Sequence, residues 1–143
     1  MSAAREPFFY IVIPVYNTED GFLRTGDRGK IDADGYISIT GRVKDIYKTA
    51  KGKYVAPVPI ESAIARTEIV EQACLIGSGM VQPVALIELT PEATDQERDD
   101  IKSLLEATRV STNETLESHA RVARFIIVKD SWTVENGLLT PTL

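Results

Sequence analysis

The sequence predicts an α+β fold, in which a small sheet of about three strands is flanked by helices and preceded by β-hairpins. Three observations predict it. Short apolar runs bounded by glycine, proline and threonine are typical of strands. Segments with apolar residues at helical spacing lie between them. The order along the chain is hairpin, hairpin, helix, two strands, helices and a last strand.

Composition and charge exclude several classes of protein. The net charge of −5 argues against a nucleic-acid-binding protein, which needs a basic surface. No apolar run approaches the ~18–20 residues of a membrane span. The single cysteine, Cys74, cannot form an internal disulfide and is interpreted as a small buried apolar residue. A cytoplasmic protein is expected, with one domain, or one domain and part of another, in 143 residues.

The first expected elements are a strand and a hairpin. "YIVIPVY" is rich in β-branched and aromatic residues, and Pro14 restricts such a strand to the edge of a sheet. After the turn signal "DADG", Ile37 and Ile39 alternate with polar residues, so 29–40 should form a hairpin with one buried face. Residues 1–16 are strongly apolar, and we expect them to pair with this hairpin or with a neighbouring chain.

A second hairpin is expected in 45–55, with its turn at Lys51–Gly52. A domain boundary is expected from Arg42 to Asp45, because the hairpins on either side share no obvious core. Residues 42–53 carry five cations and one acid. Such a run is either a solvated face or a loop that faces phosphate groups.

The rest of the chain predicts helices packed on a sheet. Pro59 suits the first turn of a helix whose apolar face holds Ile60, Ala63 and Ile64. "VEQACLIGSG" and "QPVALIELT" are expected to form two adjacent strands, and "RFIIVK" a third. The tail "DSWTVENGLLTPTL" has no period and is expected to be a loop.

Two helices are expected between the second and third of these strands. The first has a capping residue at Thr94 or Asp95. Its apolar residues at helical spacing are Ile101, Leu104 and Leu105. "STNE" (111–114) matches a capping box and predicts the start of a second, short helix.

Four motifs, "TGD", "DGYISITGR", "KGKYVAPVPIE" and "LTPT", occur in this order. Together they resemble the last part of the adenylate-forming acyl-CoA synthetases, and most closely the long-chain fatty acid CoA ligases. This resemblance covers 17–143. It implies that 17–43 is the final segment of the large nucleotide-binding domain and that 44–143 is the C-terminal lid domain. Residues 1–16 are an unassigned segment outside the family pattern.

The resemblance implies a two-step reaction. A carboxylate attacks ATP to form an acyl adenylate and pyrophosphate, and the thiol of coenzyme A then displaces AMP. The intact enzyme would use ATP with Mg²⁺ and coenzyme A, whereas no cofactor is expected on this fragment. The expected partners are the fatty acid and the large N-terminal domain of the same enzyme, with no nucleic acid. Membrane association of the intact enzyme is left open.

The resemblance assigns nucleotide binding to Asp27 and Arg42. A carboxylate can accept hydrogen bonds from both hydroxyls of a ribose, and Asp27 matches the family's ribose-binding aspartate. Arg42 matches an arginine that contacts the ribose and orders the domain boundary. From the residues alone, Asp27 could instead cap a turn and Arg42 could form a surface salt bridge.

Further residues are assigned to movement of the lid and to coenzyme A. Lys44 matches the hinge, where φ and ψ must change without breaking a core. Gly52 matches a glycine close to the pantetheine arm, because a residue without Cβ lets a ligand approach, although it also suits a simple turn. Lys48 resembles a lysine that serves the second step in some members. Glu61 is interpreted as structural, satisfying backbone donors of the glycine loop.

In the family, a lysine follows "LTPT" after one further residue and stabilises the charge of adenylate formation. It would follow Leu143, so we assign no catalytic residue and no metal ligand within this chain. The fragment is expected to be inactive alone. The alternative is a stand-alone, non-catalytic binding or interaction module derived from the same fold. His119 is interpreted as structural, and Trp132 and Leu138–Leu139 as anchors of the tail.

Overall fold

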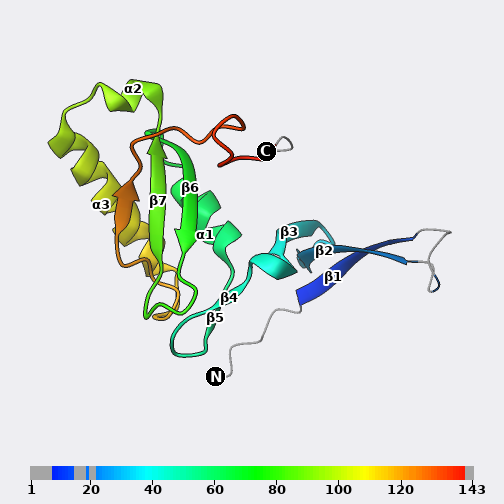
Figure 1. Cartoon of the computed structure of the whole chain (residues 1–143). Coiled ribbons are helices and arrows are strands. Elements are labelled where there is room, and N and C mark those ends of the chain that lie inside the picture. The colour runs from blue at the N-terminus through cyan, green and yellow to red at the C-terminus, as the bar shows by residue number, and fades with distance from the viewer. Residues whose placement is uncertain (1–7, 15–18, 20–21, 141–143) are drawn as a thin grey trace.

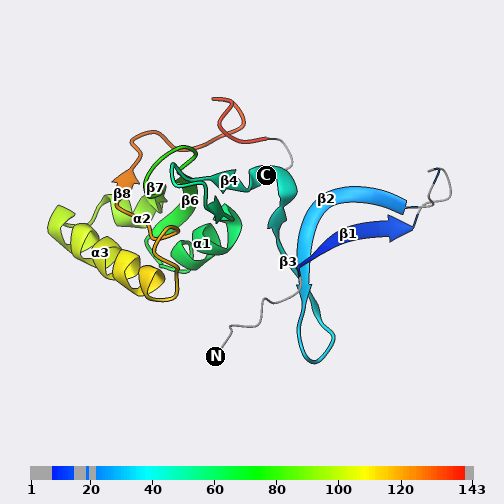
Figure 2. The same cartoon turned by 90° about the horizontal axis from the view of Figure 1, so that it is seen from below.

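The protein is described by a computed structural model that covers residues 8–14, 19 and 22–140 (Figure 1). A three-stranded antiparallel sheet projects from one side of an α/β unit, as Figures 1 and 2 show. The short 3-10 helix η1 (Val43–Asp45) connects the two parts. The α+β prediction is therefore confirmed.

The N-terminal sheet has the order β1–β2–β3, from strands Phe8–Pro14, Phe22–Ile31 and Ile37–Arg42. Strand β1 is an edge strand that pairs antiparallel with β2. The expected pairing with the 29–40 hairpin is confirmed for Phe8 and Phe9, while the later residues of β1 pair with the first part of β2, which begins before that hairpin. The rest of 1–16 lies outside the described residues.

The turn between β2 and β3 forms at "DADG", as predicted. The side chain of Asp32 accepts hydrogen bonds from the N–H groups of Asp34, at 3.0 Å, and Tyr36, at 2.9 Å. Gly35 has a φ of +88°, a conformation that favours glycine. Local side-chain-to-backbone bonds thus set the turn, which is why the sequence signal found it.

One prediction for this sheet is wrong. Ile37 and Ile39 were expected on a buried face, but they are 68% and 67% exposed. Among the described residues, β3 approaches the α/β unit only at its end, where a Cβ on Gly41 would lie 3.5 Å from Val58. Alternation identifies a strand, but it does not show whether the same chain covers the apolar face.

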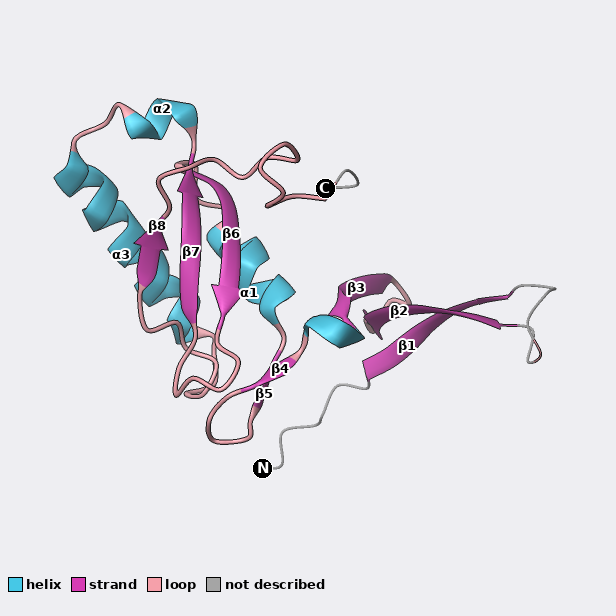
Figure 3. Ribbon diagram, in the orientation of Figure 1, coloured by secondary structure: helices cyan, strands magenta, loops and turns pink. Residues whose placement is uncertain are grey.

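The α/β unit contains a three-stranded sheet with the order β6–β7–β8 (Figure 3). Strands β6 (Val70–Ile76) and β7 (Val84–Leu89) are antiparallel, and β8 (Phe125–Ile127) runs parallel to β7. Helices α1 (Pro57–Ile64) and α3 (Arg98–Glu114) lie on one face of this sheet, and the C-terminal tail crosses the other (Figure 2). All three predicted strands are confirmed.

The core of the protein lies between these two helices and the sheet. Ile64, from α1, and Ile87, from β7, are completely buried in one cluster. The buried cluster is made of aliphatic residues from the helices, from β5 (Tyr54–Val55), β6 and β7, and from the connecting segments: Val55, Ile60, Ile64, Ile69, Val70, Leu75, Ala85, Ile87, Ala93, Ile101, Leu105 and Val122.

The predicted start of the long helix is wrong. Thr90 begins a separate short helix, α2 (Pro91–Thr94), and its hydroxyl oxygen accepts a hydrogen bond from the N–H of Ala93. Thr94 and Asp95 therefore end that helix, and α3 begins only at Arg98. Leu104 was also misplaced on the apolar face, since it is 37% exposed.

The second helix predicted at 111–114 does not exist, because these residues are the last turn of α3. The hydroxyl of Ser111 donates backwards to the carbonyl of Thr108 and does not cap a new helix. The side chain of Asn113 bonds both backbone groups of Val122, at 2.9 and 2.8 Å. These two bonds join the last turn of α3 to the segment that leads to β8. The local sequence pattern at 111–114 does not predict them.

Candidate functional site

Asp27 and Arg42 lie opposite each other on adjacent strands β2 and β3. Arg42 Nε is 3.7 Å from Asp27 Oδ1, and the two side chains are 74% and 25% exposed. The backbone N–H of Asp27 donates to the hydroxyl of Thr25 at 3.1 Å. A carboxyl group held beside an exposed guanidinium is suited to binding a polar ligand.

Lys44 lies in η1, directly after this pair. Arg42 and Ile46, which flank the helix, both have extended backbone conformations, and none of the η1 residues is buried. Gly41 precedes them with a φ of +134°. An exposed helical turn between extended residues, with no buried side chain, is compatible with the hinge predicted at Lys44, which stays a prediction.

Strands β4 (Tyr47–Lys48) and β5 (Tyr54–Val55) form the predicted second hairpin. Its turn is closed by the N–H of Gly52, which donates to the carbonyl of Thr49 at 2.9 Å. Gly52 has a φ of +72°, and a Cβ placed on it would meet no atom within 4 Å. The backbone at Gly52 is therefore open to a ligand, while its conformation still favours glycine.

Lys48 is held beside this turn by Tyr54. The Lys48 ammonium lies 4.9 Å from the centroid of the Tyr54 ring, within the range of a cation–π interaction. His119 contacts the carbonyl of Tyr54 through Nε2 at 3.2 Å and lies 3.4 Å from Glu117. The contact between His119 and β5 of the hairpin is consistent with the structural interpretation of His119.

Glu61 has a different structural role from the one expected. Its carboxyl oxygen accepts a hydrogen bond from the N–H of Leu75 at 2.7 Å, which ties α1 to β6. The backbone donor that Glu61 satisfies is therefore in β6 and not in the glycine loop. Burial raises the pKa of Glu61, against the lowering effect of that bond. Cys74 lies close by and is half-buried, and burial followed by the charge of Glu61 raises the pKa of its thiol. A raised pKa argues against a catalytic thiolate.

Tyr47 completes this cluster and was missed by sequence reasoning. Its hydroxyl is buried, and it has no hydrogen-bond partner in the part of the chain that the structure describes. Burial, followed by the charges of Glu61 and Cys74, raises the pKa of Tyr47 to about 12. A Cβ on Gly77 would lie 2.7 Å from the Tyr47 hydroxyl oxygen, so a larger residue at Gly77 would displace the ring.

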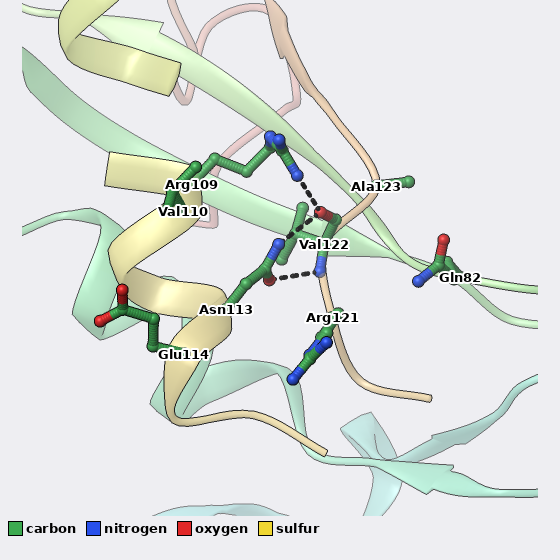
Figure 4. A pocket seen from close by; sticks show the side chains of 8 residues that line it. All are labelled: Gln82, Arg109, Val110, Asn113, Glu114, Arg121, Val122 and Ala123. Carbon is green, nitrogen blue, oxygen red and sulfur yellow. Dashed lines mark hydrogen bonds between the residues drawn. The ribbon is translucent and has the colours of Figure 1, made fainter. Parts of the chain in front are cut away.

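Two pockets lie on the α/β unit, and the second adjoins the cluster of Glu61 and Cys74. The first, of about 410 Å³, lies between α3 and the chain that follows it (Figure 4). Arg109 and Asn113 line this pocket, and both donate hydrogen bonds to the backbone carbonyl of Val122. Their polar groups therefore hold the segment after α3 in place, and we assign no ligand to this pocket. The second, of about 390 Å³, lies under the tail beside Cys74, Trp132 and Leu139.

Within the described ranges, no cluster of three or more His, Cys, Asp or Glu side chains could hold a metal ion. No helix among them has the length and apolarity needed to cross a membrane. The candidate site residues therefore fall into two groups on either side of η1: Asp27 and Arg42 on the strands before it, and Lys48 and Gly52 on the hairpin after it.

A small α/β unit that follows the exposed turn η1 and begins with an open glycine hairpin fits the lid domain that the resemblance implies. The chain belongs to the family described as the AMP-binding enzyme C-terminal domain, whose family model matches residues 44–136. The resemblance drawn from the motifs is thereby confirmed.

The relatives of this chain are named as ligases. It is 31% identical to the long-chain-fatty-acid–CoA ligase FadD15 of Mycobacterium tuberculosis, with 87% of this chain and 24% of the relative covered. It is 36% identical to the long-chain-fatty-acid–CoA ligase 6 of Homo sapiens, with 87% and 20% covered. The adenylation domain of a carboxylate reductase from Mycobacterium chelonae superposes with a TM-score of 0.75 at 25% identity, covering 97% of this chain and 25% of that chain. This chain thus spans about a quarter or less of the length of these proteins.

Proposed function

We propose that this chain is the C-terminal lid of an AMP-forming long-chain fatty acid–CoA ligase. In the first step, a fatty acid carboxylate oxygen attacks the α-phosphorus of ATP, and pyrophosphate leaves. In the second, the sulfur of coenzyme A attacks the acyl carbonyl carbon, and AMP leaves with the electrons of the broken C–O bond. The family match and the names of the relatives support this proposal, including the long-chain acid.

The observation that carries the proposal is the position of two candidate sites on either side of η1. The Asp27 carboxyl group, supported by Arg42 at 3.7 Å, is suited to the two hydroxyls of the ATP ribose. Beyond η1, the open backbone at Gly52 is suited to the pantetheine arm of coenzyme A, with Lys48 beside it. Rotation at Lys44 would change which part of the lid faces the nucleotide, so each step could use one orientation.

The same proposal sets the domain limits. Residues 17–43 would complete the large nucleotide-binding domain, and 44–143 would form the lid. Because the chain corresponds to a quarter or less of its relatives, we propose that these residues alone form no acyl-CoA. We assign no magnesium ligand to them, so Mg²⁺ would be held with ATP by the large domain. The cytoplasmic location stays a prediction.

A chimera tests this function. Residues 22–140 replace the matching segment of the M. tuberculosis ligase FadD15, and both steps are measured separately: ATP–pyrophosphate exchange for adenylation, and thioester formation from preformed acyl adenylate. We expect both activities in the chimera. Asp27→Ala should raise the KM for ATP about tenfold or more, because a charge-assisted hydrogen bond is worth ~1.5–3 kcal/mol.

Gly52→Ala should slow thioester formation and leave adenylation within about twofold of the parent, because its Cβ enters the path of coenzyme A without meeting protein atoms. Gly35→Ala is the matched control, since it also has positive φ and open space but lies in the β2–β3 turn. A chimera without either activity would contradict the proposal and favour the non-catalytic interaction module. Equal loss of both steps in Gly52→Ala would remove the coenzyme A assignment.

A further inference from the structure

Glu88 is an acidic residue in an otherwise apolar buried strand. It stands in "VALIEL", the sequence of β7, and is only 7% exposed. Its carboxyl oxygen accepts a hydrogen bond from the N–H of Trp132 at 3.2 Å. Burying a carboxyl group costs free energy unless it is bonded, so a purely packing role would be filled better by an apolar side chain. None of the roles proposed above uses Glu88.

The segment that Glu88 holds is a folded loop, although it contains no helix or strand. We call residues 131–139 the tail. The Asn136 side-chain oxygen accepts from the N–H groups of Thr133 and Leu138, at 3.1 and 3.2 Å. Its amide group donates to the carbonyl of Ser131 at 2.7 Å. The Asn136 side chain therefore joins both ends of the tail's turn, which backbone bonds from Gly137 to Val134 and from Leu139 to Thr133 also close.

Apolar packing beneath the tail is incomplete. The pocket of about 390 Å³ is lined by Trp132, Leu138 and Leu139 of the tail, by Cys74 and Leu86 of the sheet, and by the polar residues Glu61 and Gln72. Leu138 is 60% exposed. Because dispersion contacts across such a gap are weak, directional bonds must contribute much of what sets the position of the tail. Among the described residues, the Glu88–Trp132 hydrogen bond ties the first turn of the tail to the sheet.

The tail leads away from β8, across the face of the sheet opposite the helices, and towards the N-terminal sheet. In Figures 1 and 2 its red end lies on the side of the α/β unit that is nearer to the strands β2 and β3. Those strands carry Asp27 and Arg42. The end of the tail is thus directed to the side where the nucleotide would bind.

We propose that Glu88 is a positioning residue that fixes where the tail crosses the sheet, and that Asn136 gives the tail the shape that directs its end towards the nucleotide. This inference rests on the proposed function. Because the tail is directed to the side of Asp27 and Arg42, its position matters for adenylate formation. Thioester formation, assigned to the Gly52 hairpin, does not depend on it.

The first test uses the 143-residue chain and needs no activity. Trp132 is the only tryptophan, so its fluorescence and the hydrogen exchange of its N–H report on the tail. Glu88→Leu fills the buried space but removes the acceptor, and exchange at Trp132 should become about tenfold faster. Glu88→Gln keeps an acceptor and should restore slow exchange. Glu135→Gln, in the exposed part of the same tail, should change nothing. Unchanged exchange in Glu88→Leu would overturn the proposal.

The second test separates positioning from general stability. In the FadD15 chimera, Glu88→Leu and Asn136→Ala should lower ATP–pyrophosphate exchange about tenfold, with thioester formation from preformed acyl adenylate within about twofold of the parent. Asn136 is exposed, so its variant should fold even if Glu88→Leu does not. Equal loss of both steps, or no loss in an active parent chimera, would refute the positioning role. An inactive parent would instead refute the proposed function.

Discussion

The α/β unit and the N-terminal sheet both contain isoleucines on helices or strands, but these isoleucines are buried in the unit and exposed in the sheet. In the unit, Ile64 and Ile87 are 0% exposed, and helix and sheet cover each other's apolar faces. In the N-terminal sheet, Ile37 and Ile39 are more than two-thirds exposed. The unit therefore contains its own core, whereas the sheet has an apolar face that the described residues do not cover. This difference fits the proposal that the two parts belong to different domains.

The largest expected effect tests where the core lies. Ile64→Ala should destabilise the protein by about 2–5 kcal/mol, because it removes a fully buried side chain and leaves a cavity. Ile37→Ala, the same change at an exposed position, should alter the free energy of unfolding by less than about 0.5 kcal/mol. Urea unfolding followed by circular dichroism measures both. Similar losses at the two positions would show that the N-terminal sheet shares the core.

A smaller effect depends on pH and lies where the hairpin meets the unit. The pKa of Tyr47 is about 12 in the folded protein, and burial is the main cause. An unfolded tyrosine loses its proton near pH 10, so between these values the folded state holds a proton that the unfolded state has released. Stability should therefore fall as pH rises through this range.

Tyr47→Phe removes this proton and should lessen the fall in stability. Urea unfolding at about pH 9 and about pH 11 gives the difference for each variant. Tyr54→Phe, at a 64% exposed position on the same hairpin, is the matched control. If the parent and Tyr47→Phe lose the same stability at high pH, the Tyr47 hydroxyl is not held in a buried environment.

The smallest expected effect tests the independence of the unit. Removing residues 1–43 should change the free energy of unfolding of the α/β unit by less than about 1 kcal/mol, because no core residue is lost. Native-state hydrogen exchange should retain its slowest amides in β6, β7 and α3. A truncated chain without a protected core would mean that the N-terminal sheet is required for folding.

The predictions that succeeded rest on local signals. Gly35 and Gly52 form their turns with positive φ, and Pro14 lies on an edge strand, because each residue type restricts its own backbone. The predictions that failed depended on a competing contact. Thr94 was predicted to cap the long helix, but Thr90 caps the short helix α2 and Thr94 ends it. Both threonines have the side chain of a helix cap, so the local sequence does not show which of them acts as one.

The amino-acid sequence by itself determined the family, through motifs in a specific order, and it determined most of the strands and turns. Only the tertiary structure decided that the face of Ile37 is exposed, and that Asn113 ends α3 by bonding Val122. It also decided that Glu88 holds the N–H of Trp132, 44 residues further along the chain. Periodicity reports which side of an element is apolar, but burial and long-range hydrogen bonds depend on what the folded chain brings opposite that side.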